Sequence, residues 1–279
     1  MESLTEREVR SWIPARRAEQ SKQDFGRLLI VAGSTGMAGA AVLCGKAALR
    51  SGVGLATFCV PAALYPILQT SLPEATCRER YADDLPAAFR VFTAVAAGPG
   101  LGHHEEDSSV LKQILQLGKP VVLDADALND IVRFDLHQLV AEAPGDIVLT
   151  PHEGEACRLL GIKRIDNREE AAAALADKYN AVAVLKGHHT LIAAPDGRIA
   201  VNPTGNPSMA KGGSGDVLTG MTGALLAKGI PAFEAACAAC YLHGAAGDIC
   251  RDQFGDESVI ARDLIEAIPQ AFKCIRSCT

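Results

Sequence analysis

Short apolar runs alternate with alanine-rich stretches along most of this chain. The runs, rich in β-branched residues, are Leu28–Ala32, Val53–Val60, Val91–Ala97, Pro120–Leu123, Asp146–Leu149 and Ala181–Leu185. Between them the pattern predicts helices over Ala40–Ser51, Ser108–Leu117, Glu155–Leu160 and Arg168–Tyr179. Because the runs are apolar at successive positions, both faces of each strand are expected to be buried. The sequence therefore predicts an α/β fold, a mostly parallel sheet flanked by helices on both faces.

This alternation ends after Lys186. Thr190–Ala194 and Arg198–Val201, separated by Pro195-Asp-Gly197, predict a hairpin. The pattern then predicts three further helices, Asp216–Lys228, Phe233–Arg251 and Ala261–Arg276. Residues 1–25 are predicted to form a peripheral helix anchored by Trp12. No linker, low-complexity tract or repeat interrupts the pattern, so a single domain over residues 1–279 is expected.

Composition narrows the class of protein. Of the 279 residues, 48% are hydrophobic and 22% charged, as in ordinary globular proteins. The net charge of −6 provides no basic field for nucleic acid. The N-terminus mixes both charge signs and no apolar run reaches about 18 residues, so neither a signal peptide nor a membrane span is expected.

The cysteine pattern favours reduced thiols in a cytoplasm. Nine cysteines is an odd number in a chain too large to need disulfides. Cys237-x-x-Cys240 has the spacing of half a zinc site, but no second pair accompanies it and its surroundings predict a buried helix. We therefore expect these two cysteines to pack as small hydrophobic residues.

The strongest chemical signal is Ala210-Lys-Gly-Gly-Ser-Gly-Asp216, directly before a predicted helix. The backbone N–H groups of Gly213, Ser214 and Gly215 would be unpaired there and would form an anion site at the helix start. A carboxylate beside a bound phosphate repels it, so the presence of Asp216 indicates a role in proton transfer or in metal binding. The alternative is that Asp216 caps the helix and the glycines make a tight turn.

Other polar loops follow the predicted strands, and in a parallel sheet they meet at one edge. Gly33–Gly39, just before Ala40, fits neither the dinucleotide fingerprint nor the phosphate loop, and close packing of strand on helix is an equal alternative. The remaining loops are Gly98-Pro-Gly-Leu-Gly102, Thr150–Glu155 with His152, Lys186-Gly-His-His-Thr190, and the stretch with Asp126 and Asn129. Together they predict phosphoryl or nucleotide chemistry on a small molecule, with the substrate left open.

As a set, these motifs resemble the NAD(P)H-hydrate dehydratases of the ribokinase-like superfamily. Gly-Gly-Ser-Gly-Asp216 is shared across that superfamily, and the narrower resemblance runs from about Phe25 to the end of the chain. It rests on Gly33-Ser-Thr-Gly-Met-Ala-Gly-Ala-Ala41, Gly98-Pro-Gly-Leu, Leu123-Asp-Ala-Asp-Ala-Leu, Leu149-Thr-Pro-His-Glu-Gly-Glu, Val184-Leu-Lys-Gly-His-His-Thr and Asn202-Pro-Thr-Gly-Asn. Two positions depart from the family: Glu153 stands where Pro is frequent, and Ser214 where Thr is frequent.

The resemblance implies repair of the hydrated cofactors NADHX and NADPHX, with ADP (ATP in eukaryotic relatives) as co-substrate and Mg²⁺ sharing the phosphoryl charge. It implies Asp216 as the general base and gives no metal ligands. The residues it assigns to the nucleotide are Lys186, Gly187, His188, His189, Thr190, Gly213, Ser214 and Gly215; those it assigns to the hydrate are Ala40, Gly100, His152 and Asp216. Because His152 follows a different strand from Lys186, we expect it to contact the hydrate and not the nucleotide.

The resemblance also implies a homo-oligomer, a tetramer in many relatives. Some relatives carry an epimerase domain ahead of this one; because only about two dozen residues precede the first predicted strand here, we expect no such domain. Two alternatives remain. A kinase of the same superfamily would phosphorylate a small alcohol, such as a vitamin precursor, and release it intact. A non-catalytic adenylate-binding module would gain nothing from Asp216 beside phosphate, so this carboxylate argues against it.

Overall fold

The computed structural model describes residues 2–81 and 89–277. In this part of the chain ten strands form one sheet in the order β1-β10-β9-β8-β7-β6-β5-β2-β3-β4. β9 runs antiparallel to β8 and β10, and the other neighbours pair in parallel. The strands are β1 (Glu2–Ser3), β2 (Arg27–Val31), β3 (Leu55–Val60), β4 (Thr76–Glu79), β5 (Ala94–Ala97), β6 (Val121–Leu123), β7 (Ile147–Leu149), β8 (Val182–Leu185), β9 (Leu191–Ala193) and β10 (Ile199–Val201).

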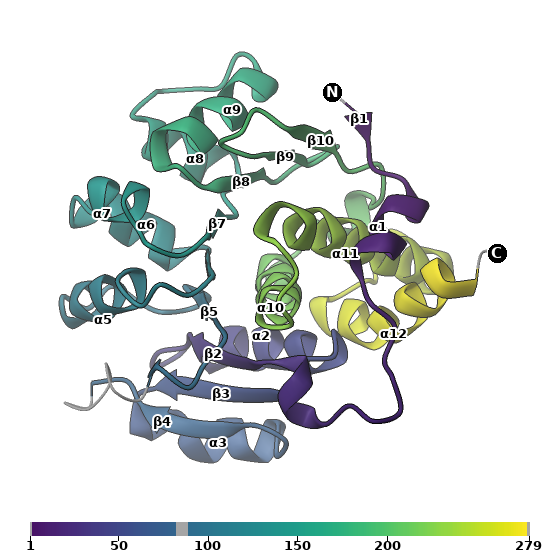
Figure 1. Ribbon diagram of the computed structural model, residues 1–279, viewed down its shortest axis with the longest axis horizontal. Helices are drawn as coiled ribbons and strands as arrows, with labels where there is room; N and C mark the ends of the chain where they lie inside the picture. The colour runs from purple at the N-terminus through teal and green to yellow at the C-terminus, as the bar shows by residue number, and fades with distance from the viewer. Residues whose placement is uncertain (1, 82–88, 278–279) are drawn as a thin grey trace.

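Helices cover both faces of the sheet (Figure 1). One layer consists of α5 (Glu106–Leu115), α6 (Asp126–Arg133), α7 (His137–Ala141), α8 (Glu153–Leu160) and α9 (Arg168–Tyr179). The other consists of α1 (Glu6–Trp12), α2 (Ala38–Arg50), α3 (Tyr65–Ser71), α10 (Ser214–Ala227), α11 (Ala232–Phe254) and α12 (Ala261–Ser277). Short 3₁₀ turns lie at Lys22–Phe25, Ala62–Leu64 and Pro207–Met209.

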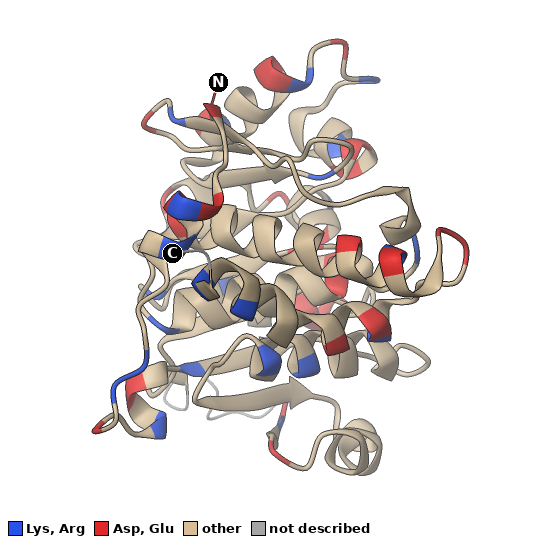
Figure 2. Cartoon of the chain, turned by 90° about the vertical axis from the view of Figure 1, so that its right-hand side faces the viewer, with Lys and Arg blue, Asp and Glu red and all other residues tan. Residues whose placement is uncertain are grey.

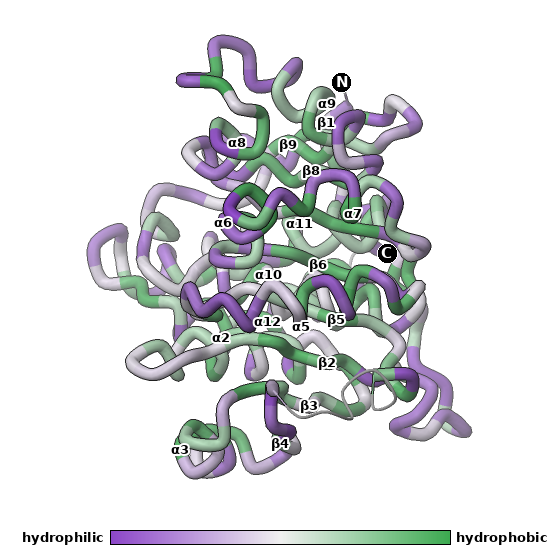
Figure 3. The backbone as a smooth tube through the Cα atoms, turned by 90° about the vertical axis from the view of Figure 1, so that its left-hand side faces the viewer, coloured by the Kyte–Doolittle hydropathy of each residue, from purple (hydrophilic) through white to green (hydrophobic). Residues whose placement is uncertain are grey.

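Each face of the sheet has its own hydrophobic core. Side chains alternate between faces along a strand, so in β2 Leu28 and Ile30 join the core under α2 and α10, whereas Leu29 and Val31 join the core under α5 and α6. All four are fully buried, and the strands form the hydrophobic interior of the molecule in Figure 3. The predicted mostly parallel sheet with two helix layers is confirmed.

The six predicted strands and the hairpin are present, but two strands were missed. β1 has two exposed residues and β4 has no fully buried one, so neither shows an apolar run. The single helix predicted over residues 1–25 is wrong: the described part of this segment, residues 2–25, contains the strand β1, the seven-residue α1 and the turn Lys22–Phe25. Its main anchor is the fully buried Val9, whereas Trp12 is only partly buried against the same core.

The cysteines predicted to pack in a helix do so. Cys237 and Cys240 are buried inside α11. No helix in the described residues is both long and apolar enough to cross a bilayer. On the side of the molecule shown in Figure 2, basic and acidic residues are interspersed along loops and helix ends.

The strand order reverses between β2 and β5. From β2 the chain proceeds outward through β3 and β4, and from β5 it proceeds in the other direction through β6, β7 and β8. Two neighbouring strands whose connections leave in opposite directions create a crevice at their carboxyl ends, where ligands bind in open α/β sheets.

Candidate active site

A cavity of about 660 Å³ lies at the carboxyl end of β8 and the amino end of α10, a volume within the range of small-molecule sites. Eight of the residues predicted from the sequence line it: His152, Lys186, Gly187, His188, His189, Thr190, Ser214 and Gly215. The fold thus brings together the loop after β8 and the start of α10, which the hairpin of β9 and β10 separates along the chain.

A second wall of this cavity is the segment Asn202–Met209. It is held against α11 by Asp248, whose carboxylate accepts hydrogen bonds from Asn206 Nδ2 at 2.8 Å and from the Gly205 backbone N–H at 3.0 Å. Gly244 is required for this approach, because a Cβ there would lie 2.2 Å from Thr204 Oγ1. The sequence signal was present in Asn202-Pro-Thr-Gly-Asn, but its partner on α11 was not predicted.

The amino end of α10 is built as the glycine pattern predicts. Gly213 is its N-cap, with φ +92°, a backbone conformation that favours glycine, and a Cβ there would lie 2.6 Å from Leu43 Cδ1. The helix starts at Ser214, two residues earlier than predicted. The Ser214 N–H donates to Lys211 O at 3.3 Å, whereas the N–H groups of Gly213 and Gly215 are available to an anion.

A buried histidine lies beside this helix start. Ser214 Oγ is 3.3 Å from Nε2 of His243, which lines the cavity from α11. Burial lowers the pKa of His243 to about 4, so the ring is neutral near pH 7. Sequence reasoning missed His243 because it stands among alanines and cysteines in an otherwise apolar helix.

Asp216 stands in the first turn of α10. Burial, and next the carboxylate of Asp124, raise its pKa to about 7, against the opposing effect of Lys186. The alternative that Asp216 is the helix cap is wrong, because that position belongs to Gly213. A carboxyl group titrating near pH 7 is suited to accepting a proton at physiological pH.

A buried charge cluster lies beneath the helix start. Lys186 Nζ is 2.6 Å from Asp124 Oδ1 and 3.8 Å from Glu155 Oε2, and Thr219 Oγ1 donates to Asp124 Oδ2 at 2.7 Å. Although burial opposes ionisation of both partners, their attraction and hydrogen bonds hold the pKa of Asp124 below and that of Lys186 above its ordinary value. A Cβ on Gly215 would be 3.4 Å from both groups, so the cluster adjoins the anion site.

His152 has a structural role as well as a place in the cavity. Its Nδ1 accepts hydrogen bonds from the N–H groups of Gly154 and Glu155 at 3.0 and 3.4 Å, which makes it the N-cap of α8. His152 and Lys186 follow different strands, as predicted, but these strands do not keep the two residues apart. β7 and β8 are neighbours, the Lys186 N–H donates to Pro151 O at 2.9 Å, and both residues line one cavity. Contact of His152 with the hydrate stays a prediction.

Ala40 and Gly100 lie apart from that cavity lining, at the crevice between β2 and β5. Gly100 has φ +57°, and a Cβ there would lie 2.9 Å from both Ala40 Cβ and Met37 O. The loops after the two strands are also joined by a hydrogen bond from Gly33 N–H to Pro99 O at 2.8 Å. They therefore form one continuous wall, which we call the switch-point wall (residues 33–40 and 98–102).

Packing of α10 on α2 connects the switch-point wall to the cavity. A Cβ on Gly220 would lie 2.0 Å from Cys44 O, so the two helices approach closely, with Asp216 at the end of α10. In the wall itself, a Cβ on Gly33 would lie 3.0 Å from Ala41 Cβ, which supports close packing at this glycine, whereas Gly36 and Gly39 have open space.

Comparison with known proteins identifies the family of this chain. A family model described as NAD(P)H-hydrate dehydratase matches residues 28–270. The chain belongs to the NAD(P)H-hydrate dehydratase family. It is 36% identical to the ADP-dependent (S)-NAD(P)H-hydrate dehydratase of Bacillus subtilis, over 96% of this chain and 97% of that protein.

Solved structures of this dehydratase family share the fold. The Bacillus subtilis ADP/ATP-dependent NAD(P)H-hydrate dehydratase co-crystallized with ATP/Mg²⁺ superposes with a TM-score of 0.87 at 34% identity, over 98% of each chain. A ribokinase-like superfamily protein of Enterococcus faecalis superposes as well, with a TM-score of 0.89 at 26% identity, which confirms the ribokinase-like fold. This chain spans about half the length of the bifunctional relatives that it matches. The bifunctional NAD(P)H-hydrate repair enzyme of Moorella thermoacetica, for example, is 41% identical over 97% of this chain and 53% of its own.

Mg²⁺ is implied by the dehydratase family, and the carboxylates beside α10 could bind it only together with the phosphates of a nucleotide. Among residues 2–81 and 89–277 no three His, Cys, Asp or Glu side chains come together as metal ligands. Mg²⁺ commonly keeps several waters and binds through one or two carboxylates together with substrate phosphates. Asp216, next to the anion site, is the carboxylate that would suit this mode, because both oxygens of Asp124 are already bonded, to Lys186 and to Thr219.

Proposed function

We propose that this chain is an ADP-dependent (S)-NAD(P)H-hydrate dehydratase, which restores NADHX and NADPHX to NADH and NADPH and releases AMP and phosphate. The observation that carries the proposal is Asp216, a partly buried carboxyl group with a pKa of about 7 in the first turn of a glycine-capped helix. A binding module would be weakened by this charge beside phosphate, whereas an enzyme needs it as a base.

Hydroxide is a poor leaving group, so the hydrate's hydroxyl must be activated. Asp216 accepts the hydroxyl proton as the oxygen forms a bond to the β-phosphorus of ADP, and the bond to the AMP oxygen breaks. The ring nitrogen's lone pair then expels phosphate by cleavage of the carbon–oxygen bond. Loss of a proton from the neighbouring carbon restores the reduced nicotinamide ring.

The residues around Asp216 suit the charge that this transfer develops. The N–H groups of Gly213 and Gly215 would hold the moving phosphoryl group, since unpaired donors at a helix start stabilise anions, whereas the N–H of Ser214 donates to Lys211 O at 3.3 Å. The ammonium of Lys186 adds a positive charge beneath Gly215. Mg²⁺, when bound with the nucleotide, would share the phosphate charge beside Asp216.

The binding assignments divide between the two parts of the site. We propose that the cavity takes the adenine nucleotide, through the loop Lys186–Thr190 and the start of α10. The hydrate would lie over Ala40 and Gly100 at the switch-point wall and reach Asp216, with His152 at the rim. We further propose a cytoplasmic homotetramer, as the family resemblance suggests; the buried free thiols Cys237 and Cys240 are in keeping with a reducing compartment.

The test is incubation of the protein with hydrated NADPH, Mg²⁺ and ADP while the absorbance of the reduced nicotinamide ring is followed. We expect absorbance to return as AMP and phosphate appear in equal amounts, and parallel reactions with ATP measure the nucleotide preference. Formation of a stable phosphorylated hydrate would instead indicate a kinase. Nucleotide binding without any turnover would contradict the proposal.

A further inference from the structure

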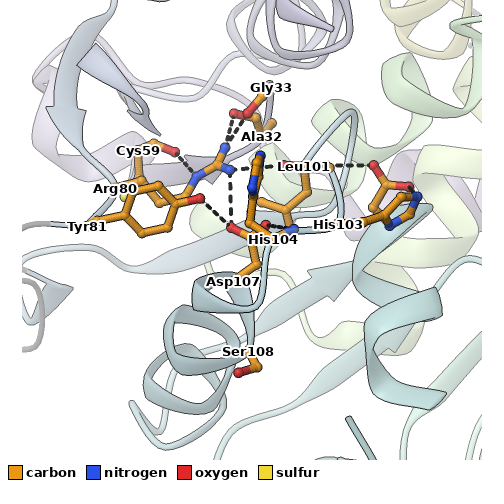
Figure 4. A network of polar contacts seen from close by, with 12 residues as sticks. Ala32, Gly33, Cys59, Arg80, Tyr81, Leu101, His103, His104, Asp107 and Ser108 are labelled. Atoms are coloured by element: carbon orange, nitrogen blue, oxygen red, sulfur yellow. Dashed lines mark hydrogen bonds and ion pairs between the residues drawn. The ribbon is translucent and has the colours of Figure 1, made fainter. Parts of the chain in front are cut away.

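Arg80 is an arginine with no exposed side-chain surface, directly after the carboxyl end of β4. Figure 4 shows its guanidinium extended toward the switch-point wall. All five of its N–H donors have acceptors: Cys59 O at 3.4 Å from Nε, Leu101 O and Asp107 Oδ1 at 3.1 and 3.3 Å from NH1, and Ala32 O and Gly33 O from NH2. A side chain from the edge strand thus reaches the ends of three other strands.

Three of the four carbonyl acceptors belong to the segments that form the crevice, and the fourth, Cys59 O, belongs to the neighbouring strand β3. Ala32 and Gly33 directly follow β2, Cys59 is in β3, and Leu101 is in the loop after β5. The two halves of the switch-point wall start from strands whose connections leave in opposite directions. Arg80 therefore links both halves through one rigid, planar group.

Asp107 holds this group from the other side. It lies in the first turn of α5, also without exposed surface, and its Oδ1 additionally accepts from Tyr81 Oη at 2.9 Å. Its Oδ2 accepts from the His104 backbone N–H at 3.3 Å, in the chain that leads out of the loop after β5. The carboxylate therefore fixes the guanidinium and the end of that loop together.

We propose that Arg80, held by Asp107, is a positioning residue for the hydrate side of the active site. It fixes the relative position of the loop that leads into α2 and Ala40 and the loop that carries Gly100. This inference rests on the proposed function for the identity of the substrate, but the geometric claim is independent of it. A buried ion pair is not needed for stability alone, because apolar residues of similar volume pack at no greater cost. Apolar residues, however, have no hydrogen-bond donors for the carbonyl groups in the two halves of the switch-point wall.

The test compares hydrate and nucleotide in the double variant Arg80→Met/Asp107→Leu. This variant leaves no unpaired charge in the core, and urea unfolding checks that it is folded. We expect kcat/KM for the hydrate to fall roughly 10²-fold, as displaced positioning elements cause. The dissociation constant of ADP, measured by calorimetry, should change less than about twofold, since the nucleotide cavity is not touched by Arg80. Arg198→Met, which removes a half-exposed arginine paired with Asp196 and Glu234, is the control and should behave as wild type.

A second variant and a binding measurement complete the test. Arg80→Lys keeps the buried ion pair but has three donors in place of five, and should lose an intermediate part of the hydrate kcat/KM. Affinity for the product NADPH should fall in the double variant while ADP affinity holds, and this readout applies even if the wild-type protein turns over no hydrate. An unchanged hydrate kcat/KM and NADPH affinity in Arg80→Lys and in the folded double variant would overturn the inference. So would equal losses for NADPH and ADP.

Discussion

The ammonium nitrogen of Lys186 lies 2.6 Å from Oδ1 of Asp124, a carboxylate that is buried beneath the start of α10. The side chain of Asp124 is 2% exposed and that of Lys186 21%. Glu155 adds a second buried carboxylate on the same lysine, 3.8 Å away. One cation therefore compensates two carboxylates directly beneath the proposed phosphate site.

Lys186→Met should consequently destabilise the fold. It leaves Asp124 and Glu155 buried beside no cation, and breaking such a pair costs about 3–5 kcal/mol in the free energy of unfolding. Because Lys186 holds the pKa of Asp124 below 3.8, this stability is present above that pH and is lost as pH falls through the folded value. Urea unfolding should show a larger deficit at about pH 8 than at about pH 5, where Asp124 without its cation takes up a proton.

The matched control is Lys186→Met combined with Asp124→Asn, which removes the charge on the carboxylate as well. Part of the lost stability should return in the double variant, as a coupling in the double-mutant cycle. Additive losses from the two single changes would show that the pair contributes no coupling.

Asp216→Asn tests the general base. The change keeps the size of the side chain but removes the proton acceptor, so kcat should fall on the order of 10²-fold or more. Affinity for ADP should hold or improve, because one negative charge beside the phosphates is gone. Steady-state kinetics and calorimetry measure the two effects, and turnover near the wild-type rate would place the base elsewhere.

The pH dependence of turnover should follow the same carboxyl group. Asp216 must be deprotonated to accept the hydroxyl proton, so kcat/KM should rise with pH through an inflection near the pKa of about 7. Bound phosphates oppose ionisation, so the inflection in kcat should lie higher. Rates measured across about pH 5 to 9 decide this, and a profile that is flat down to about pH 5 would contradict the raised pKa.

Much of this arrangement could be predicted from the sequence because the strands are apolar on both faces. Runs such as Leu28–Ala32 fix the sheet, and the parallel order brings the loops after β7 and β8 to one edge. The glycines before Asp216 have few uses other than a tight helix start with free N–H groups. These features depend on residues that are neighbours in the chain.

What could not be predicted depends on partners far away in the chain. Arg80 follows the edge strand β4 and would ordinarily be expected to face solvent; only carbonyls up to 48 positions away explain its burial. His243 is marked by no local pattern, and its partner Ser214 lies 29 residues away. The role of His152 as a helix cap was likewise missed, because histidine is not among the usual capping residues.

His152 offers a way to separate capping from ligand contact. His152→Ala removes both, and His152→Asn restores a side chain that caps helices well. If His152 contacts the hydrate, both variants should raise KM for the hydrate more than the dissociation constant of ADP. Only His152→Ala should lose about 1 kcal/mol of stability in urea unfolding. If KM for the hydrate in His152→Asn equals the wild-type value, His152 acts as a helix cap and does not contact the hydrate.

Asp216 should also make the protein less stable than it would be without the charge. Its pKa of about 7 in the folded state exceeds the ordinary 3.8, so the folded state binds more protons than the unfolded state between these values. Stability contributed by the neutral carboxyl is present in acid and is lost as pH rises through about 7. Asp216→Asn does not titrate, so its advantage over wild type should grow from near zero at about pH 4 to roughly 2–4 kcal/mol at about pH 8. Urea unfolding of both proteins at several pH values measures this difference.

Because the charge on Asp216 then lowers the stability of the folded state, its presence is explained by the reaction and not by folding. A wild-type protein more stable than the variant at about pH 8 would contradict that conclusion.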